Sequence, residues 1–499
     1  MSNAIVIGGG FGGIASAIRL SAKGYKVLLI DRCPMLGGRA QVFERDGFRF
    51  DAGPTVITAP FLFDELFELH NRRRQDYVEF RSLNPWYRFQ FSDGTTFDYG
   101  GEIADTEAEI ARFNKADVYG YRRLLTHSKK IFDVGFTQLS DRPFHKILTM
   151  LAQVPTLIRL RCYRTVWQMV CSYIRHPKLR QVFSVQPLLV GGNPFDTTSI
   201  YGLIHFLERR WGIHFAMGGT GALVEGLRLL MEELGIEIKL NTTVDKILVK
   251  NNHACGVQLQ NGDQIEAELV VANVDPKYLY SHMLDSSLQT WSVRKKTQHH
   301  SLSMGLFVLF FGTDRVYNEI AHHTIWLCER YQELLKEIFS AQALPKDFSL
   351  YLHRPTATDP SFAPEGCDSF YVLAPVPNLN ANINWKIQGP LLRQQIIETL
   401  SEHLLPDLGQ HLVTDFYMTP EDFATDYLSE GGAGFSIAPL FSQSAWFRFH
   451  NKAEGPENLY LVGAGTHPGA GLPGVISSAK VLDRLLVNVS SKPVVAKNN

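Results

Sequence analysis

A glycine-rich loop near the N-terminus restricts the fold of this chain more than any other feature. Residues 8–13 read Gly-Gly-Gly-Phe-Gly-Gly and directly follow an apolar run at residues 4–7. A stretch that favours a helix comes next at residues 14–23, and a second apolar run at residues 25–30 ends on Asp31. This succession of strand, loop, helix, strand and acid is typical of a Rossmann-type unit, and it predicts that the chain binds a dinucleotide.

The positions in this unit have separate physical roles. Gly8 permits the tight turn, Gly10 lets the backbone approach a pyrophosphate, and Gly13 lets the helix pack close to the strand. The helix that follows directs free N–H groups and the positive end of its dipole at the phosphates. We expect Asp31 to accept hydrogen bonds from ribose hydroxyls, and its charge would repel a 2′-phosphate, which disfavours NADP.

Composition narrows the class of protein further. The chain has 499 residues and a formal net charge of −1, which fits a globular protein of two or three domains without bulk attraction to nucleic acid. The six cysteines have neither metal-ligand nor redox spacing, so we predict reduced thiols, a cytoplasmic location and no metal site. The apolar run near the N-terminus has only four residues and no basic region before it, so we expect a strand there and not a signal peptide. The longest apolar run elsewhere, residues 304–312, is much shorter than the roughly 20 residues that cross a bilayer, so we expect no transmembrane helix.

Two further glycine-rich segments lie far downstream. Residues 218–221 open a helix-like stretch, and we expect the strand-like runs that follow, up to residue 273, to complete the first sheet, with a β-meander among them. Residues 463–474 contain five glycines between a strand pattern at 458–462 and a helix pattern at 475–489. A second helix N-terminus aimed at a flavin ring would stabilise its anionic reduced form, which favours FAD over NAD.

The loop Gly37-Gly38-Arg39 suits a close approach to the same ligand, where an arginine meets a phosphate or the negative charge of a ring system. The predicted FAD-binding residues are therefore Gly8, Gly10, Phe11, Gly12, Gly13, Asp31, Arg32, Gly38, Arg39, Val244, Gly463, Gly465, Gly474 and Val475.

The spacing of these segments predicts an α/β protein with a discontinuous Rossmann-like FAD-binding domain. Long insertions between its parts would form an α+β substrate domain with a helical region that contacts a membrane. The predicted parts are residues 1–75, 217–290 and 451–490 for the FAD-binding domain, 76–216 and 291–450 for the substrate domain, 142–195 for the membrane-contact region, and 491–499 for a disordered tail.

One stretch has an unusual charge distribution. Between Arg142 and Phe195 there is no Asp or Glu, although the whole chain is nearly neutral. Basic residues interleaved with Trp and Leu are typical of amphipathic helices on anionic membranes, where each basic residue contributes about 1 kcal/mol. A core helix pair with solvated basic edges is the alternative. The basic residues are Arg142, Lys146, Arg159, Arg161, Arg164, Arg175, Lys178 and Arg180.

Together these motifs resemble those of the bacterial FAD-dependent carotenoid desaturases, within the flavin amine oxidase-like superfamily. The motif Gly-Ala-Gly-Thr-His-Pro-Gly at residues 463–469 is far more specific than the first loop. Asp31 departs from the family, whose members often have Glu there, although the shorter acid should still reach a ribose. The resemblance spans about residues 3–486 and is carried by residues 8–13, 37–39, 50–58, 188–194, 218–223 and 461–469.

The resemblance implies that the chain binds FAD and dehydrogenates 15-cis-phytoene, a C40 polyene, in steps through zeta-carotene and neurosporene toward lycopene. Each step removes a hydride from one allylic carbon and a proton from its neighbour, so a proton acceptor is needed. His467 is a weak candidate, because a loop histidine more often caps backbone groups. Glu208, which is followed by Arg209-Arg210-Trp211, is another candidate with a structural alternative.

The implied partners are a membrane-dissolved carotenoid, an anionic membrane surface, and O₂ or a quinone as electron acceptor. The implied location is the inner face of the cell membrane, as a peripheral, monotopic protein, and a homo-oligomer stays open.

Several other functions remain open. Sister enzymes include a diapophytoene desaturase, a 3,4-desaturase, a three-step desaturase that stops at neurosporene, and a carotenoid isomerase. A flavin amine oxidase is disfavoured because the presumed substrate region is basic and apolar. A lipid escort of the same fold, which carries prenylated proteins without a flavin, is disfavoured by the intact loops at residues 37–39 and 463–474.

Overall fold

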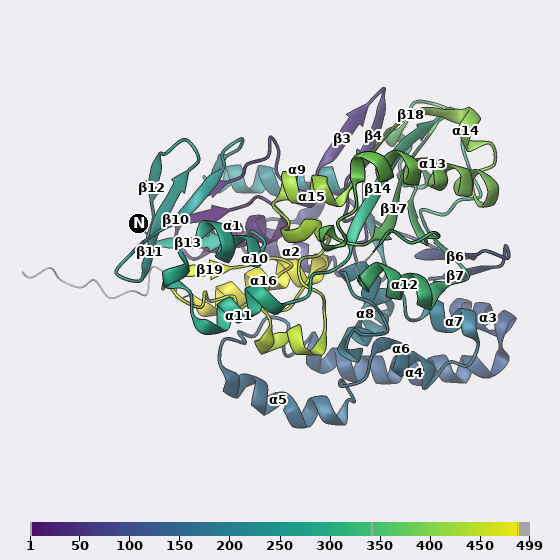
Figure 1. The fold of residues 1–499 in the computed structure, drawn as a ribbon, viewed down its shortest axis with the longest axis horizontal. Helices are drawn as coiled ribbons and strands as arrows, with labels where there is room; N and C mark the ends of the chain where they lie inside the picture. Colours follow the sequence, from purple (N-terminus) through teal and green to yellow (C-terminus); the bar gives the residue numbers. More distant parts are fainter. Residues whose placement is uncertain (1, 341–342, 487, 489–499) are drawn as a thin grey trace, which may run out of the picture.

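Two sheet regions lie side by side in the computed structural model, which describes residues 2–340, 343–486 and 488 (Figure 1). A parallel sheet and a small meander occupy one side, a large mixed sheet occupies the other, and helices of the first half of the chain lie along the lower edge in this view. The predicted tail, residues 491–499, lies outside the described residues.

Five parallel strands form the first sheet, in the order β19-β13-β1-β2-β9. The central strand is covered on both faces, so its apolar residues alternate between two clusters: Ala4 and Val6 join one, and Ile5 and Ile7 join the other. The strands are β1 (Asn3–Ile7), β2 (Lys26–Ile30), β9 (Glu237–Lys239), β13 (Leu269–Ala272) and β19 (Leu459–Leu461).

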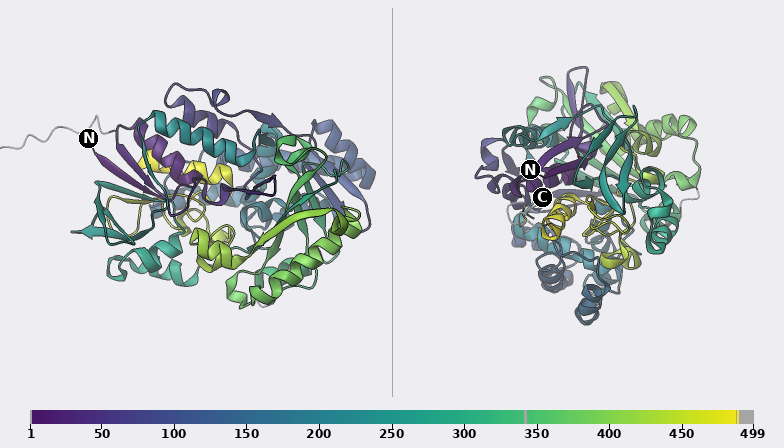
Figure 2. Two further views of the ribbon diagram at one scale, coloured as in Figure 1. Left: turned by 90° about the horizontal axis from the view of Figure 1, so that it is seen from above. Right: turned by 90° about the vertical axis from the view of Figure 1, so that its left-hand side faces the viewer.

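Helices from the two ends of the chain pack together against this sheet. Helix α1 (Phe11–Ala22) begins at the first glycine-rich loop and α16 (Leu472–Leu485) at the last one (Figure 2). Ile14 of α1 and Ile476 of α16 belong to the same buried cluster. The last helix starts three residues before the predicted position, with Pro473 in its first turn, where the missing N–H of proline costs nothing.

The strands between the second and third glycine segments are only partly in the first sheet. β9 and β13 join it as predicted, but the three strands between them form a separate antiparallel meander. Turns at Asn251-Asn252 and at Gly262, all with positive φ, fold each of these strands back on the preceding one. The meander consists of β10 (Val244–Lys250), β11 (His253–Leu259) and β12 (Gln264–Glu266).

Seven strands form the mixed sheet, in the order β18-β14-β17-β16-β15-β6-β7, and only the β15–β6 pair is parallel. Strands β6 and β7 form an antiparallel hairpin at one edge of this sheet. The strands are β6 (Tyr87–Phe91), β7 (Thr96–Tyr99), β14 (Gly305–Thr313), β15 (His323–Leu327), β16 (Leu350–His353), β17 (Asp368–Val376) and β18 (Leu412–Met418).

The remaining strands form two short pairs, and helices cover the sheets. Helices α3 and α4 are separate, because the side chain of Asn114 accepts a hydrogen bond from the Ala116 N–H at 3.1 Å and starts a new helix. The pairs are β3 (Val42–Arg45) with β4 (Phe48–Asp51), and β5 (Phe80–Ser82) with β8 (His214–Ala216). The main helices are α2 (Phe61–Glu68), α3 (Ile103–Phe113), α4 (Lys115–Gly135), α5 (Ile147–Arg159), α6 (Val166–Cys171), α7 (Pro177–Val182), α8 (Leu203–Trp211), α9 (Gly219–Glu233), α11 (Trp291–His299), α12 (Tyr331–Ser340), α13 (Trp385–His403), α14 (Leu408–His411) and α15 (Pro420–Tyr427).

Candidate functional site

One cavity of about 550 Å³ lies where the strands of the parallel sheet end, a volume typical of ligand sites. Gly8 follows β1, Asp31 follows β2, Asn273 follows β13 and Gly463 lies just beyond β19, and all four line the cavity. Ligands of parallel α/β sheets bind at this edge. The predicted FAD-binding residues that line it are Gly8, Gly10, Phe11, Gly12, Asp31, Arg32, Gly38, Arg39, Val244, Gly463, Gly465, Gly474 and Val475.

Gly13 is outside this lining and has the packing role predicted for it. A Cβ atom at this position would lie 1.9 Å from the carbonyl oxygen of Gly8, so only glycine lets α1 pack this close to the end of β1. Gly8 itself has φ of +92°, a conformation that favours glycine and makes the tight turn. A Cβ at Gly12 would lie 2.6 Å from Oδ1 of Asn273. Gly8, Gly12 and Gly13 therefore leave no room for a side chain at these positions of the loop.

Asp31 is buried at the cavity wall, and both of its carboxylate oxygens accept backbone hydrogen bonds. The Gly9 N–H donates to Oδ2 at 2.5 Å, and the Cys33 N–H donates to Oδ1 at 2.7 Å. Each oxygen keeps a second lone pair for another donor. The carboxylate thus fixes the glycine loop and remains able to accept a hydrogen bond from a ribose hydroxyl.

Two charged groups beside the loop have buried atoms that lack partners within the described residues. The Arg39 guanidinium donates through Nη2 to the Ser429 hydroxyl at 2.8 Å, but its Nε has no acceptor. Oδ2 of Asp275 likewise has no donor, and burial raises the pKa of this carboxyl group. Unpaired buried polar atoms are costly unless a ligand completes them. This donor and acceptor set fits the polar groups of a flavin dinucleotide.

A buried arginine donates hydrogen bonds to the C-terminal glycine loop, residues 463–474. Arg448 donates to the carbonyl oxygens of Thr466 at 2.9 Å and Ala464 at 2.6 Å. A Cβ at Gly474 would lie 2.5 Å from the carbonyl oxygen of Gly469, so the loop turns tightly into α16. The N-terminus of α16 consequently faces the cavity that α1 also faces, as predicted for two loops that share one cofactor.

His467 lines the cavity but has a structural partner. Its Nε2 lies 2.8 Å from the carbonyl oxygen of Leu139, which accepts the N–H. Burial lowers the pKa of this imidazole to about 4, so it is neutral at pH 7. The contact matches the backbone-capping role expected of a loop histidine.

Beyond the glycine loops the cavity is apolar. Alternate residues of two neighbouring strands line it. Leu306 and Val308 belong to β14, Met304 directly precedes this strand, and Leu373 and Pro375 belong to β17. The residues between them pack into the core of the mixed sheet, because side chains of a strand alternate in direction.

One region of the cavity wall is polar. The Thr55 hydroxyl is hydrogen-bonded to the hydroxyls of Tyr371 at 2.6 Å and Tyr351 at 3.2 Å. Glu208, on α8, also lines the cavity and has no exposed surface. Its Oε1 is 3.4 Å from the Tyr87 hydroxyl, and its Oε2 has no partner in the described part of the chain. Burial raises the pKa of Glu208 to about 8, although the charge of Arg209 acts in the opposite direction.

Some lining residues were not predicted. Asn273 and Asp275 have a signal in the sequence, since they directly follow a buried strand that pairs with β1, and such strands end at the same edge. Thr55 and Tyr351 have no such signal, because they come from two distant segments that meet only in the folded chain.

The acid-free stretch at residues 142–195 is not uniform. α5 has an exposed apolar face, on which Leu148, Leu151 and Ile158 are 73%, 55% and 60% exposed. α6 and α7 instead pack into the core, and Lys178 is paired with Asp93. No helix within the described residues is long and apolar enough to cross a membrane. Among the helices of this stretch, α5 is therefore the one with an exposed apolar face.

Comparison with known proteins agrees with this site. Residues 11–481 match the family described as flavin containing amine oxidoreductase, which confirms the prediction of a flavin cofactor, FAD. A protein of Pseudescherichia vulneris named phytoene desaturase (lycopene-forming) is 47% identical over 98% of this chain and 99% of its own length. A protein of Pantoea ananas with the same name is 46% identical over the same shares of both chains.

Solved structures show the same fold at low identity. An engineered putrescine oxidase superimposes with a TM-score of 0.65 over 97% of both chains, at 13% identity. This confirms the predicted α/β flavin amine oxidase-like fold. The protein is thus an oxidoreductase, and its chain belongs to the flavin-containing amine oxidoreductases and, within them, to the carotenoid desaturases that its sequence resembles.

Proposed function

We propose that this protein dehydrogenates 15-cis-phytoene in successive steps through zeta-carotene and neurosporene toward lycopene. The observation that carries the proposal is one continuous cavity, which joins the glycine loops to a chamber walled by alternate residues of β14 and β17. Relatives that are 46–47% identical along almost the whole chain have phytoene desaturase in their names, which supports the same substrate class.

An apolar chamber suits a hydrocarbon. Each CH₂ group that moves from water into such a chamber gains about 0.8 kcal/mol, so a C40 chain needs no polar anchor to bind. The side chains of Leu306, Val308 and Leu373 would hold the polyene and keep water away from the carbons that react.

The chain's own residues would position the cofactor and handle the proton. The loop at Gly8 and Gly10, the Asp31 carboxylate and the Arg39 guanidinium would hold FAD, which supplies a hydride acceptor when bound. Glu208 is the proposed proton acceptor, since it is a cavity-lining carboxyl group with an unpartnered oxygen. In its ionised form it would take the proton that leaves the neighbouring carbon.

We place the protein on the inner face of the cell membrane, with α5 as the contact. Leu148, Leu151 and Ile158 lie on the exposed face of this helix, while Met150 and Leu157 on its other face line the cavity. One helix thus borders both the surroundings and the substrate chamber, which supports passage of a lipid-soluble substrate past it. Exposed basic residues at its ends, among them Lys146 and Arg159, would meet anionic headgroups.

The domain division, the electron acceptor and the assembly are also proposals. Residues 1–75, 217–290 and 451–490 would form the FAD-binding domain, with the substrate domain in the insertions. Electrons would leave to O₂ or a membrane quinone, and a homo-oligomer on the membrane stays open.

The test is incubation of the FAD-loaded protein with phytoene in anionic liposomes, under air or with a quinone. We expect coloured polyenes, with lycopene as the end product, when the lipids are extracted and separated. Bound flavin and available phytoene without any longer-wavelength product would refute the proposal. Accumulation of neurosporene would support the desaturation reaction but show that it stops before lycopene, after fewer steps.

A further inference from the structure

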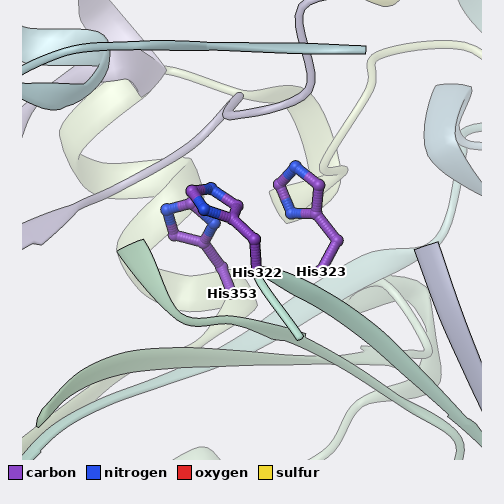
Figure 3. Close-up of side chains that lie close together, drawn as sticks. All are labelled: His322, His323 and His353. Atoms are coloured by element: carbon purple, nitrogen blue, oxygen red, sulfur yellow. The ribbon is translucent and has the colours of Figure 1, made fainter. Parts of the chain in front are cut away.

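Three buried histidines lie close together (Figure 3). One of them, His323, contacts Tyr351 of the polar part of the cavity wall. His322 directly precedes β15, His323 is its first residue, and His353 is the last residue of β16. His323 and His353 are direct cross-strand partners, so the pairing of β15 with β16 brings their rings together. One nitrogen of each of the three side chains lies within 4.8 Å of the others.

The hydrogen bonds of this histidine cluster are incomplete. Nδ1 of His322 is 2.7 Å from the Thr358 hydroxyl, and Nδ1 of His323 is 2.8 Å from the Tyr351 hydroxyl. Nε2 of both residues has no partner within the described residues, and neither has Nδ1 or Nε2 of His353. Four unpartnered polar atoms in one buried place are exceptional, and they point to a missing ligand.

The surroundings are compatible with a bound cation. The rings of Phe215 and Tyr371 contact the cluster, with centroids 4.6 Å from His322 and 4.9 Å from His353. The neighbouring Arg354 is paired with Asp368 at 3.0 Å, which balances its charge. Neutral imidazole is the commonest metal ligand in proteins.

We propose that His322, His323 and His353 bind one divalent transition-metal ion, with Zn²⁺ as the occupant. Three imidazoles are a known ligand set for zinc, and a water molecule would take the fourth position. Zinc–nitrogen bonds of about 2.0–2.1 Å in a tetrahedron place the nitrogens about 3.4 Å apart. The present separations are at most 4.8 Å, so binding would draw the nitrogens together by up to about 1.4 Å.

The partners of the opposite ring nitrogens support this assignment. Metal-bound histidines usually have their second nitrogen held by a polar group, which fixes the ring orientation. The hydroxyls of Thr358 and Tyr351 hold Nδ1 of His322 and His323 in this way and leave Nε2 for the ion. Since Tyr351 lines the cavity, the ion would fix one part of the cavity wall rather than react with substrate. The proposal is independent of the function proposed above.

The test measures metal in the FAD-loaded protein after expression with added zinc and removal of free metal. Mass spectrometry of the digested protein should find about one zinc ion per chain, and zinc X-ray absorption should show imidazole nitrogen ligands. The double variant His323→Gln and His353→Gln should lose at least about tenfold of the bound zinc. His205→Gln is the matched control and should keep the zinc. His205 is also buried, neither of its nitrogens has a partner among the residues that the structure describes, and it lies outside the cluster.

Two results would overturn the site. One is zinc below about a tenth of an ion per chain in the wild-type protein, and the other is equal zinc in the double variant and the wild type. Flavin absorbance reports whether the variant folds. If it does not, the X-ray absorption of the wild-type protein decides, since a zinc spectrum without imidazole scattering rejects these ligands.

Discussion

At the scale of single residues, Glu208 is the group whose burial has the clearest consequence. Its carboxyl group is fully buried, and burial raises its pKa to about 8. In the unfolded chain a glutamate titrates near its ordinary value, about 4.3. Between these two values the native state keeps a proton that the unfolded state gives up, so stability falls as the pH rises.

Glu208→Gln should remove this dependence, because glutamine has a similar shape and carries no charge at any pH. Relative to the wild type, the variant should gain stability steadily between about pH 5 and about pH 8. Thermal unfolding at several pH values measures this, with the exposed Glu266→Gln as control. Parallel curves for wild type and variant would show that Glu208 is not kept protonated.

If Glu208 is also the proton acceptor, the variant should lose about 10²–10⁴-fold in kcat.

Gly13 is a residue whose substitution should act through packing alone. The Cβ of Gly13→Ala would lie 1.9 Å from the Gly8 carbonyl oxygen and push α1 away from β1. We expect a loss of at least about 1–3 kcal/mol in the free energy of unfolding, together with weaker FAD binding. Gly409→Ala is the matched control, because Gly409 lies in α14 with open space around it, so this variant should be neutral or slightly more stable. Equal effects of the two changes would contradict the packing role.

At the scale of elements, α5 differs from the helices around it. A soluble helix normally turns its apolar side to the core, but α5 has apolar residues on both sides, one toward the cavity and one toward the surroundings. The arrangement is explained if a membrane covers the outer side.

Replacing Leu148, Leu151 and Ile158 by Asp should therefore release the protein from anionic liposomes. Each buried side chain of this kind contributes about 1.5–3 kcal/mol, so the triple variant should bind at least about 100-fold more weakly in a flotation assay. Ile387 and Leu391 of α13, which are 58% and 54% exposed, provide the control, and Asp at both positions should leave binding unchanged. If the α5 variant and the α13 variant bound the liposomes equally well, α5 would not be the membrane contact.

At the scale of the whole molecule, the site is made by segments that are distant in sequence. The loop at Gly8, the residues after β13 and the loop at Gly463 meet only because β1, β13 and β19 are neighbours in one parallel sheet. A ligand that bridges these segments should stabilise the folded chain as one unit.

FAD should accordingly raise the midpoint of thermal unfolding by about 2–5 °C at saturating concentration, measured by tryptophan fluorescence. FMN lacks the adenosine half of FAD and should give a smaller shift, because it cannot reach the ribose site at Asp31 and the ring site together. Identical shifts with FMN and FAD would contradict the placement of the dinucleotide along the glycine loops.

Much of the glycine-loop end of the cavity was predictable because it depends on local patterns. The turn at Gly8, the acid after β2 and the glycines before α16 each follow from residues close together in the chain, and thirteen of the fourteen predicted residues line the cavity. The role of Gly13, close packing of α1 against β1, was also predicted from the spacing of the glycines in the loop. The cluster of His322, His323 and His353 could not be predicted, since neighbouring strands must pair before residues 323 and 353 meet.

The sequence by itself determined the parallel unit, the cofactor class and the glycine positions, because backbone conformation and helix dipoles act over a few residues. Only the tertiary structure decided that α5 has an exposed apolar face while apolar residues of α6 and α7 pack into the core, although all three lie in the same acid-free stretch. It also decided that β10, β11 and β12 leave the first sheet, and that Glu208 is buried at the cavity wall. Burial and strand pairing depend on which distant segments pack together, and no local pattern contains that information.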